Sequence, residues 1–155
     1  MNKIGLSNEA TKKVAEHLDQ HLADLHVLYS KLHNYHWNVE GKGFFTLHTK
    51  LEELYDGVAE EIDAVAERIL MIGHRPSASL AAYLKKAKLK EAASAPVSCE
   101  DIAADLLSDY GTLVSGLRTG IAAAQDAGDE VSVDLMIGSL SEYEKTIWML
   151  DAFLK

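Results

Sequence analysis

The segment 46–72, TLHTKLEELYDGVAEEIDAVAERILMI, decides the fold, because its apolar residues recur with the period of an α-helix. Leu, Val and Ile side chains return every three or four positions and form one stripe. The stripe consists of Leu47, Leu51, Leu54, Val58, Ile62, Val65 and Ile69. Such a helix buries its apolar face against other helices. The sequence predicts that it ends at Gly73 and Pro76, two residues that do not continue helices.

The same period predicts three further long helices. The first spans about 7–38, with Leu18, Leu22, Leu25, Tyr29 and Leu32 on one face. The third is expected to start at an N-cap, Ser98, with Asp101 in the capping-box position, and to run to about residue 125, with Gly128 as its C-cap. The fourth is expected over about 129–153. Its candidate core residues are Leu135, Leu140, Ile147, Leu150 and Leu154. Alternating strand patterns with hairpin turns are absent.

Four long amphipathic helices in 155 residues predict an all-α fold and a single domain, residues 1–155. The connection 77–97 between the second and third helices is long, with a short helical piece near residues 80–86. A long crossover of this kind is typical of ferritin-like four-helix bundles. We therefore expect a ferritin-like four-helix bundle with a short extra helix in the crossover.

Composition limits the classes of partner. The formal net charge is −9, which repels a phosphate backbone and attracts cations. No apolar run approaches the roughly 20 residues that a membrane span needs, and the first residues lack an apolar signal core. Cys99 is the only cysteine, so an internal disulfide is impossible. These features favour a cytoplasmic protein.

Histidines and carboxylates in the second helix suggest a metal site. Imidazole and carboxylate are ligands that ferrous iron accepts. No glutamate is followed three residues later by histidine, so the Glu-x-x-His motif of a di-iron bundle is missing. His48 and Glu52 are four residues apart, as are Asp63 and Glu67, and each pair shares one helix face.

Distance separates these two pairs within one chain. Glu52 and Asp63 are eleven residues apart, or about 16 Å along a helix. A two-fold axis crossing the helix would instead bring one pair against the other pair of a second subunit. His36, at the end of the first helix, would join His48 and Glu52 across the short turn. Structural or solvated roles for these residues remain the alternative.

Other candidates are expected to be structural. His17 and His21 have the i, i+4 spacing of a metal pair but no nearby acid, which favours surface histidines. Trp37, beside His36, is expected to pack in the core.

Several segments resemble the Dps family of mini-ferritins, named for DNA protection in starved cells. They are 33–39 (HNYHWNV), 43–48 (GFFTLH), 61–68 (EIDAVAER) and 147–154 (IWMLDAFL). The resemblance covers nearly the whole chain. It implies a homododecameric cage that oxidises ferrous iron with hydrogen peroxide or dioxygen, stores ferric mineral and protects against oxidative stress.

The resemblance also assigns the site residues. It implies that His36, His48 and Glu52 of one subunit bind iron together with Asp63 and Glu67 of another. Many family members have Asp where this chain has Glu52, which makes Glu52 the least secure ligand. Zinc would be an adventitious occupant of the same site.

Passage of iron and binding of DNA are the remaining expectations. The resemblance implies that Asp129 and Asp134 line a three-fold pore, although acids at a helix N-terminus are also favoured by its dipole. Family members that bind DNA often carry a Lys/Arg-rich tail, and only Lys3 precedes the first helix here. We therefore expect weak or absent DNA binding. The alternative is a DNA-compacting protein in which iron oxidation is secondary.

Overall fold

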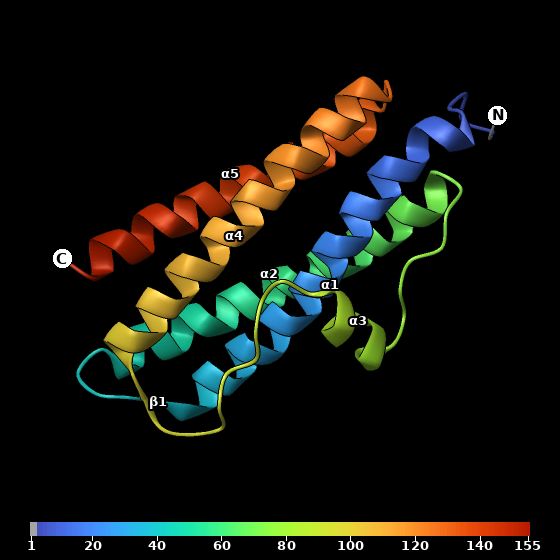
Figure 1. Ribbon diagram of the computed structural model, residues 1–155. Coiled ribbons are helices and arrows are strands. Elements are labelled where there is room, and N and C mark those ends of the chain that lie inside the picture. The colour runs from blue at the N-terminus through green and yellow to red at the C-terminus, as the bar shows by residue number, and fades with distance from the viewer. Residues whose placement is uncertain (1–2) are drawn as a thin grey trace.

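The computed structural model describes residues 3–155 and shows four long helices arranged as a bundle (Figure 1). The helices are α1 (Asn8–Asn38), α2 (Phe44–Met71), α4 (Cys99–Asp126) and α5 (Glu130–Phe153). α1 packs along α2, α4 packs along α5, and α1 also contacts α4. A short helix, α3 (Leu80–Lys86), lies in the crossover. The predicted fold class is confirmed.

Side-chain caps set the helix starts. The Ser7 hydroxyl accepts a hydrogen bond from the Ala10 amide at 3.1 Å, and the Ser98 hydroxyl accepts one from the Asp101 amide at 3.1 Å. Each bond satisfies an amide that has no partner within the first helical turn. Gly128, with φ of 66°, ends α4 in the left-handed region that glycine tolerates. The observed boundaries therefore lie within two residues of the predicted ones.

The core is a continuous apolar layer between the helices. The stripe predicted on α1 is buried except for the half-buried Tyr29. The stripe on α2 is buried at five positions, and Leu54 and Ile62 are half-buried at its edges. Tyr110 of α4 is 2 % exposed and completes this layer.

The prediction for α5 was wrong in part. Leu150 is buried, but Leu154 is 38 % exposed, and the other three predicted core residues are only half-buried. The buried apolar positions are instead Met136, Tyr143 and Leu150. α5 carries apolar residues on more than one side, so periodicity alone does not select the face that meets the core.

Large apolar side chains remain exposed on the single chain. They include Trp37, Phe45, Leu70, Met71, Trp148 and Phe153. An exposed apolar surface of this extent is typical of a protein that associates with another protein. None of the described helices is both long enough and apolar enough to span a membrane.

Polar residues of α1 hold the crossover against the bundle. The Asp19 carboxylate accepts hydrogen bonds from the Ser77 amide at 2.7 Å and the Ser77 hydroxyl at 2.8 Å, and it forms an ion pair with Lys86. One turn further along α1, Asp24 accepts bonds from the Lys88 and Leu89 amides at 2.6 and 2.9 Å. These bonds satisfy backbone groups that an irregular segment cannot pair with itself.

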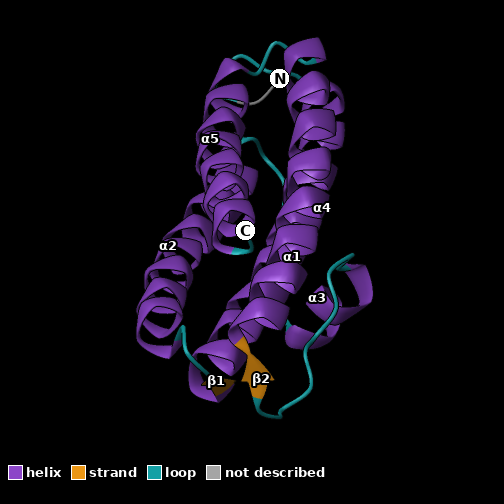
Figure 2. Ribbon diagram, turned by 90° about the vertical axis from the view of Figure 1, so that its left-hand side faces the viewer, coloured by secondary structure: helices purple, strands orange, loops and turns teal. Residues whose placement is uncertain are grey.

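The same helix also holds the end of the crossover. The Asn34 side-chain amide donates to the carbonyls of Ala92 and Ala93 at 3.0 and 3.2 Å. Figure 2 shows the crossover running down the outside of the bundle, beside α1 and α4. The crossover is therefore held against the bundle by hydrogen bonds and is not a free loop.

A minimal parallel sheet closes this end of the bundle, although the sequence predicted no strands. β1 (Val39–Glu40) pairs with β2 (Val97–Ser98) (Figure 2). Two residues per strand are too few to produce an alternating pattern. The pairing ties the turn after α1 to the residues that precede α4.

Removal of the Asp19 carboxylate should weaken the attachment of the crossover to α1. Burial alone would raise the pKa of this carboxyl, but hydrogen bonds from Lys86 and Ser77 outweigh burial and hold the pKa below its ordinary value of 3.8. We expect Asp19→Ala to lower the free energy of unfolding by about 2 kcal/mol at pH 7. Glu16→Ala, an exposed position on the same helix, should have little effect. Urea unfolding of both variants measures the difference.

The same carboxylate predicts a pH dependence. A group with a lowered pKa stabilises the folded state above its unfolded pKa, and the contribution is lost as pH falls through the folded pKa. The difference in the free energy of unfolding between wild type and Asp19→Ala should therefore decrease below pH 3.8. A gap that persists unchanged in acid would contradict the assignment.

Candidate functional site

Two histidines meet where α1 ends and α2 begins. The rings of His36 and His48 are stacked, with centroids 3.7 Å apart and an interplanar angle of 18°. The hairpin between the helices produces this proximity, as the sequence predicted. His36 is buried, and His48 is half-buried.

Reciprocal hydrogen bonds determine the tautomer of both rings. Nδ1 of His36 lies 2.8 Å from the carbonyl oxygen of His48, and Nδ1 of His48 lies 2.8 Å from the carbonyl oxygen of His36. A carbonyl oxygen only accepts, so each Nδ1 carries the proton and donates it. In the neutral ring, Nε2 then keeps its lone pair. Both histidines are thus prepared to bind a metal through Nε2.

The three candidate carboxylates lie on the exposed surface of α2. Glu52 follows His48 by one turn, whereas Asp63 lies about 16 Å beyond Glu52 along the helix and Glu67 lies one turn beyond Asp63. In the described part of the chain, none of the three makes a hydrogen bond or an ion pair. Unpaired carboxylates on one helix face are available to a cation.

One protomer does not assemble the five predicted residues. The structure brings His36 and His48 together, with Glu52 one turn away, and leaves the Asp63–Glu67 pair distant. Within residues 3–155, no group of three or more His, Cys, Asp or Glu side chains is placed to hold a metal ion. This arrangement is what a site divided between two protomers requires, and the shared site stays a prediction.

Aromatic residues surround the histidine pair. Trp37 is 71 % exposed and Phe45 is 85 % exposed, while Phe44 stacks on His48 with centroids 4.9 Å apart. The expectation that Trp37 packs in the core of its own chain was therefore wrong. Exposed aromatic rings beside a polar site indicate a surface that another protein covers.

His21 is not the surface histidine that the sequence suggested. It is buried, and its Nε2 lies 2.9 Å from Glu61 of α2. The Tyr143 hydroxyl of α5 donates to the other oxygen of Glu61 at 2.5 Å. The acid comes from another helix, so spacing along α1 does not reveal it.

This cluster shifts the pKa values of Glu61 and Tyr143. Burial alone would raise the pKa of the Glu61 carboxyl, but the hydrogen bonds from His21 and Tyr143 hold it below its ordinary value. Burial and the neighbouring Glu61 raise the pKa of Tyr143 well above its ordinary value. The cluster links α1, α2 and α5 as a satisfied polar contact inside the core.

The two predicted pore residues have different environments. Asp129 is 2 % exposed, caps α5 by accepting a bond from the Ser132 amide at 3.1 Å, and forms an ion pair with Arg68 of α2. Arg68 also donates to the Ser132 hydroxyl at 2.8 Å. Asp134 is exposed. The pore role stays a prediction, and the buried pairing of Asp129 leaves Asp134 as the freer carboxylate.

Comparison with protein families identifies similar proteins over nearly the whole chain. The model of the Ferritin-like domain matches residues 15–155. DNA protection during starvation protein 2 of Bacillus anthracis is 45 % identical over 143 residues, which cover 92 % of this chain and 97 % of that protein.

Solved structures agree. A Dps protein from Vibrio cholerae, described as a ferritin-like diiron-carboxylate protein, is 38 % identical and superposes with a TM-score of 0.95. The match covers all of this chain and 97 % of that one. A Dps protein from Bacillus brevis is 42 % identical, with a TM-score of 0.91 over 95 % of this chain and 98 % of that one.

The Arg68–Asp129 pair should matter for stability because it is buried. We expect Arg68→Met to lower the free energy of unfolding by about 3–5 kcal/mol, since it leaves a buried carboxylate without its partner. Arg118→Met is the matched control, because Arg118 pairs with Glu144 on the exposed surface. That control should change stability by less than about 1 kcal/mol. Equal losses in the two variants, measured by urea unfolding, would argue against a stabilising role for the buried pair.

Proposed function

Because this chain belongs to the Dps family of ferritin-like proteins, we propose that it oxidises ferrous iron at sites shared between two protomers and sequesters the ferric product inside a cage. The observation that carries the proposal is the His36–His48 pair, whose reciprocal hydrogen bonds leave both Nε2 atoms free for a metal. Membership of the family rests on the matches over nearly the whole chain.

The proposed site uses residues from two copies of α2. His36, His48 and Glu52 of one protomer would face Asp63 and Glu67 of the partner subunit across a two-fold axis. Such an axis generates two equivalent sites in each dimer. Support comes from the separation of the two pairs on α2 and from the exposed Trp37 and Phe45 beside the histidines, which a partner would cover.

Ferrous iron is the substrate of the proposed reaction. Two ferrous ions each give up one electron to hydrogen peroxide; with two protons, the O–O bond breaks and two waters form. No hydroxyl radical is released when both electrons are delivered together. The carboxylates neutralise charge and favour the ferric state, and the imidazoles complete coordination. Dioxygen is the alternative oxidant.

Protonation should inhibit the site. A histidine binds a metal only while Nε2 keeps its lone pair, so acid competes with iron for the same atom. The reciprocal Nδ1 bonds leave Nε2 as the atom that a proton would occupy.

Assembly into a closed cage, a dodecamer in our proposal, would place the remaining exposed apolar residues in contacts between protomers. Several of them, including Ile137 and Trp148, lie on α5 rather than on the helices that carry the proposed ligands. They are available for a second kind of contact, which a closed cage needs in addition to the two-fold one. Asp134 of α5 is the carboxylate that we propose for a passage by which iron enters.

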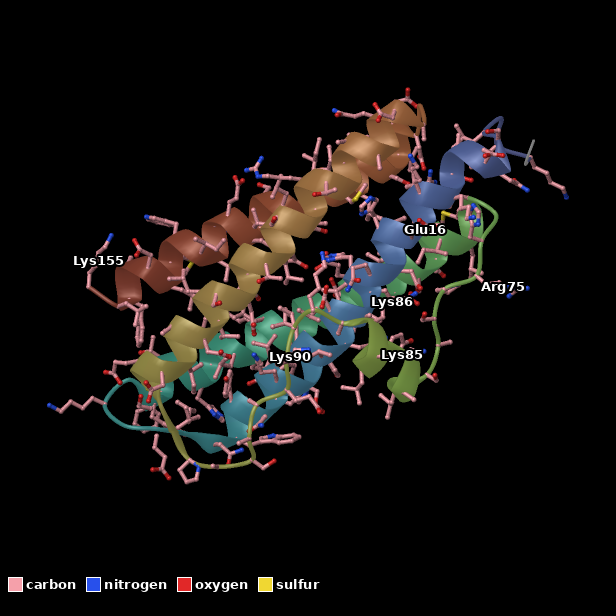
Figure 3. All side chains as sticks on the ribbon, viewed as in Figure 1. Glu16, Arg75, Lys85, Lys86, Lys90 and Lys155 are labelled. Atoms are coloured by element: carbon pink, nitrogen blue, oxygen red, sulfur yellow. The ribbon has the colours of Figure 1, made fainter. Side chains whose placement is uncertain are left out.

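Binding of DNA is not part of the proposal, although the names of several relatives refer to DNA protection. The chain carries a net charge of −9, which opposes contact with phosphates. Figure 3 shows Lys85, Lys86 and Lys90 around the crossover, the principal basic cluster. Lys86 is already paired with Asp19. This pairing removes one of the three charges from the cluster.

Complementation between two inactive variants tests the shared site. His48→Ala and Asp63→Ala should each abolish rapid iron oxidation when assembled alone. In a mixed dimer, one of the two sites receives both substitutions and the other receives none. Random co-assembly should therefore restore about a quarter of the wild-type sites. Stopped-flow oxidation of ferrous iron by hydrogen peroxide measures the recovery.

The matched control for complementation is a mixture of His48→Ala with His36→Ala. Both changes fall on the same half of the site, so every site in the mixture carries a substitution. Recovery in this control, or none in the His48→Ala and Asp63→Ala mixture, would exclude the proposed division of the site.

Gel retardation tests the expectation for DNA. We expect no retardation of supercoiled DNA at physiological salt, because the net charge of the chain is negative. Strong retardation that Lys85→Glu and Lys90→Glu abolish would show instead that the crossover lysines form a DNA-binding surface.

A further inference from the structure

A tyrosine of α2 lies directly against one of the proposed ligands. The ring of Tyr55 meets the ring of His36 edge to face, with centroids 5.4 Å apart and an interplanar angle of 89°. We propose that Tyr55 is a positioning residue that holds His36 in its metal-binding orientation. The inference rests on the proposed iron site and adds a residue to it.

Tyr55 also contacts two further rings of α1. The ring of His33 stacks on it, with centroids 3.9 Å apart and an interplanar angle of 21°. Nδ1 of His33 lies 2.9 Å from the carbonyl oxygen of Tyr29 and donates to it, which keeps His33 in place on α1. The ring of Tyr29 meets that of Tyr55 at 86°, with centroids 6.4 Å apart. Tyr55 is thus enclosed by two rings of α1 and cannot move away from His36 freely.

His36 needs such a support. Its hydrogen bond to the His48 carbonyl selects the tautomer, but a single bond through Nδ1 still allows the ring to tilt about that bond. A tilt moves Nε2, the atom that would bind iron. The His36 ring stacks against the His48 ring. The Tyr55 ring, which is perpendicular to that of His36, limits the remaining tilt of His36. Groups that orient a ligand in this way commonly change metal affinity 10- to 100-fold when they are removed.

General stabilisation by aromatic packing is the simpler explanation, and the chain contains a control for it. His26 of α1 stacks on Tyr83 of α3, with centroids 3.8 Å apart and an interplanar angle of 11°. This histidine–tyrosine pair resembles His33–Tyr55 in geometry but lies at the crossover. If Tyr55 contributes only packing energy, neither Tyr55→Leu nor Tyr83→Leu should change metal binding at the His36–His48 pair.

The test uses the assembled full-length protein and cobalt(II) as the probe. Cobalt accepts the same imidazole and carboxylate ligands, and its visible absorption reports ligand geometry. We expect Tyr55→Leu to weaken cobalt binding about ten-fold or more and to alter the absorption spectrum. Tyr55→Phe keeps the ring and should restore both, and Tyr83→Leu should leave both unchanged. Wild-type affinity and spectrum in Tyr55→Leu, or an equal change in Tyr83→Leu, would overturn the proposal.

Two further measurements separate this inference from the iron site itself. His48→Ala should abolish cobalt binding; if it does not, the proposed site is wrong whatever Tyr55 does. Crystal structures of Tyr55→Leu and Tyr55→Phe give a readout that needs no metal. We expect the His36 ring to be displaced from the His48 carbonyl in Tyr55→Leu and retained in Tyr55→Phe. An undisplaced His36 in Tyr55→Leu would refute the positioning role even if the site binds cobalt.

Discussion

A straight α-helix holds its side chains at fixed separations, and this constraint governs the functional surface of the protein. α2 carries one His–Glu pair near its start and one Asp–Glu pair eleven residues later, about 16 Å away. No bending of side chains closes such a distance. Under the proposed function, the protomer therefore contributes two halves of a site at two places, which a second copy of the helix would join. The short turn after α1 adds His36 to the first half, and the β1–β2 pairing anchors that turn.

Much of the fold follows from local signals. Ser7, Ser98 and Gly128 mark helix ends by hydrogen bonding and backbone conformation, which are properties of short segments, so they were recognisable in the sequence. The buried face of α5 was not recognisable in the sequence, because apolar residues surround that helix and only packing against α4 selects among them. The course of the crossover also escaped prediction. Asp19, Asp24 and Asn34 bind segments 58 or more residues away, and nothing in their own neighbourhood indicates those partners.

The candidate site shows the same division between local and distant information. Helix spacing and the hairpin predicted that His36 would lie beside His48, and the structure places their rings in contact. The reciprocal bonds to backbone carbonyls depend on the exact approach of two helices and have no sequence pattern. Likewise, His21 finds Glu61 on a different helix, and Asp129 finds Arg68, so their roles inside the core depend on tertiary packing. The positions of residues that share one helix face were easier to predict than the partners of residues that bridge two helices.

The lack of a complete ligand cluster within one protomer has a consequence for the order of assembly and iron oxidation. Within residues 3–155, a single chain gathers no group of three or more His, Cys, Asp or Glu side chains that could hold a metal ion. Under the proposed function, redox chemistry would begin only after two subunits have met. Activity would then depend on subunit concentration more steeply than linearly at high dilution. Assembly would then prevent premature oxidation, because the oxidation of iron would start only where the cage that holds its product is already forming.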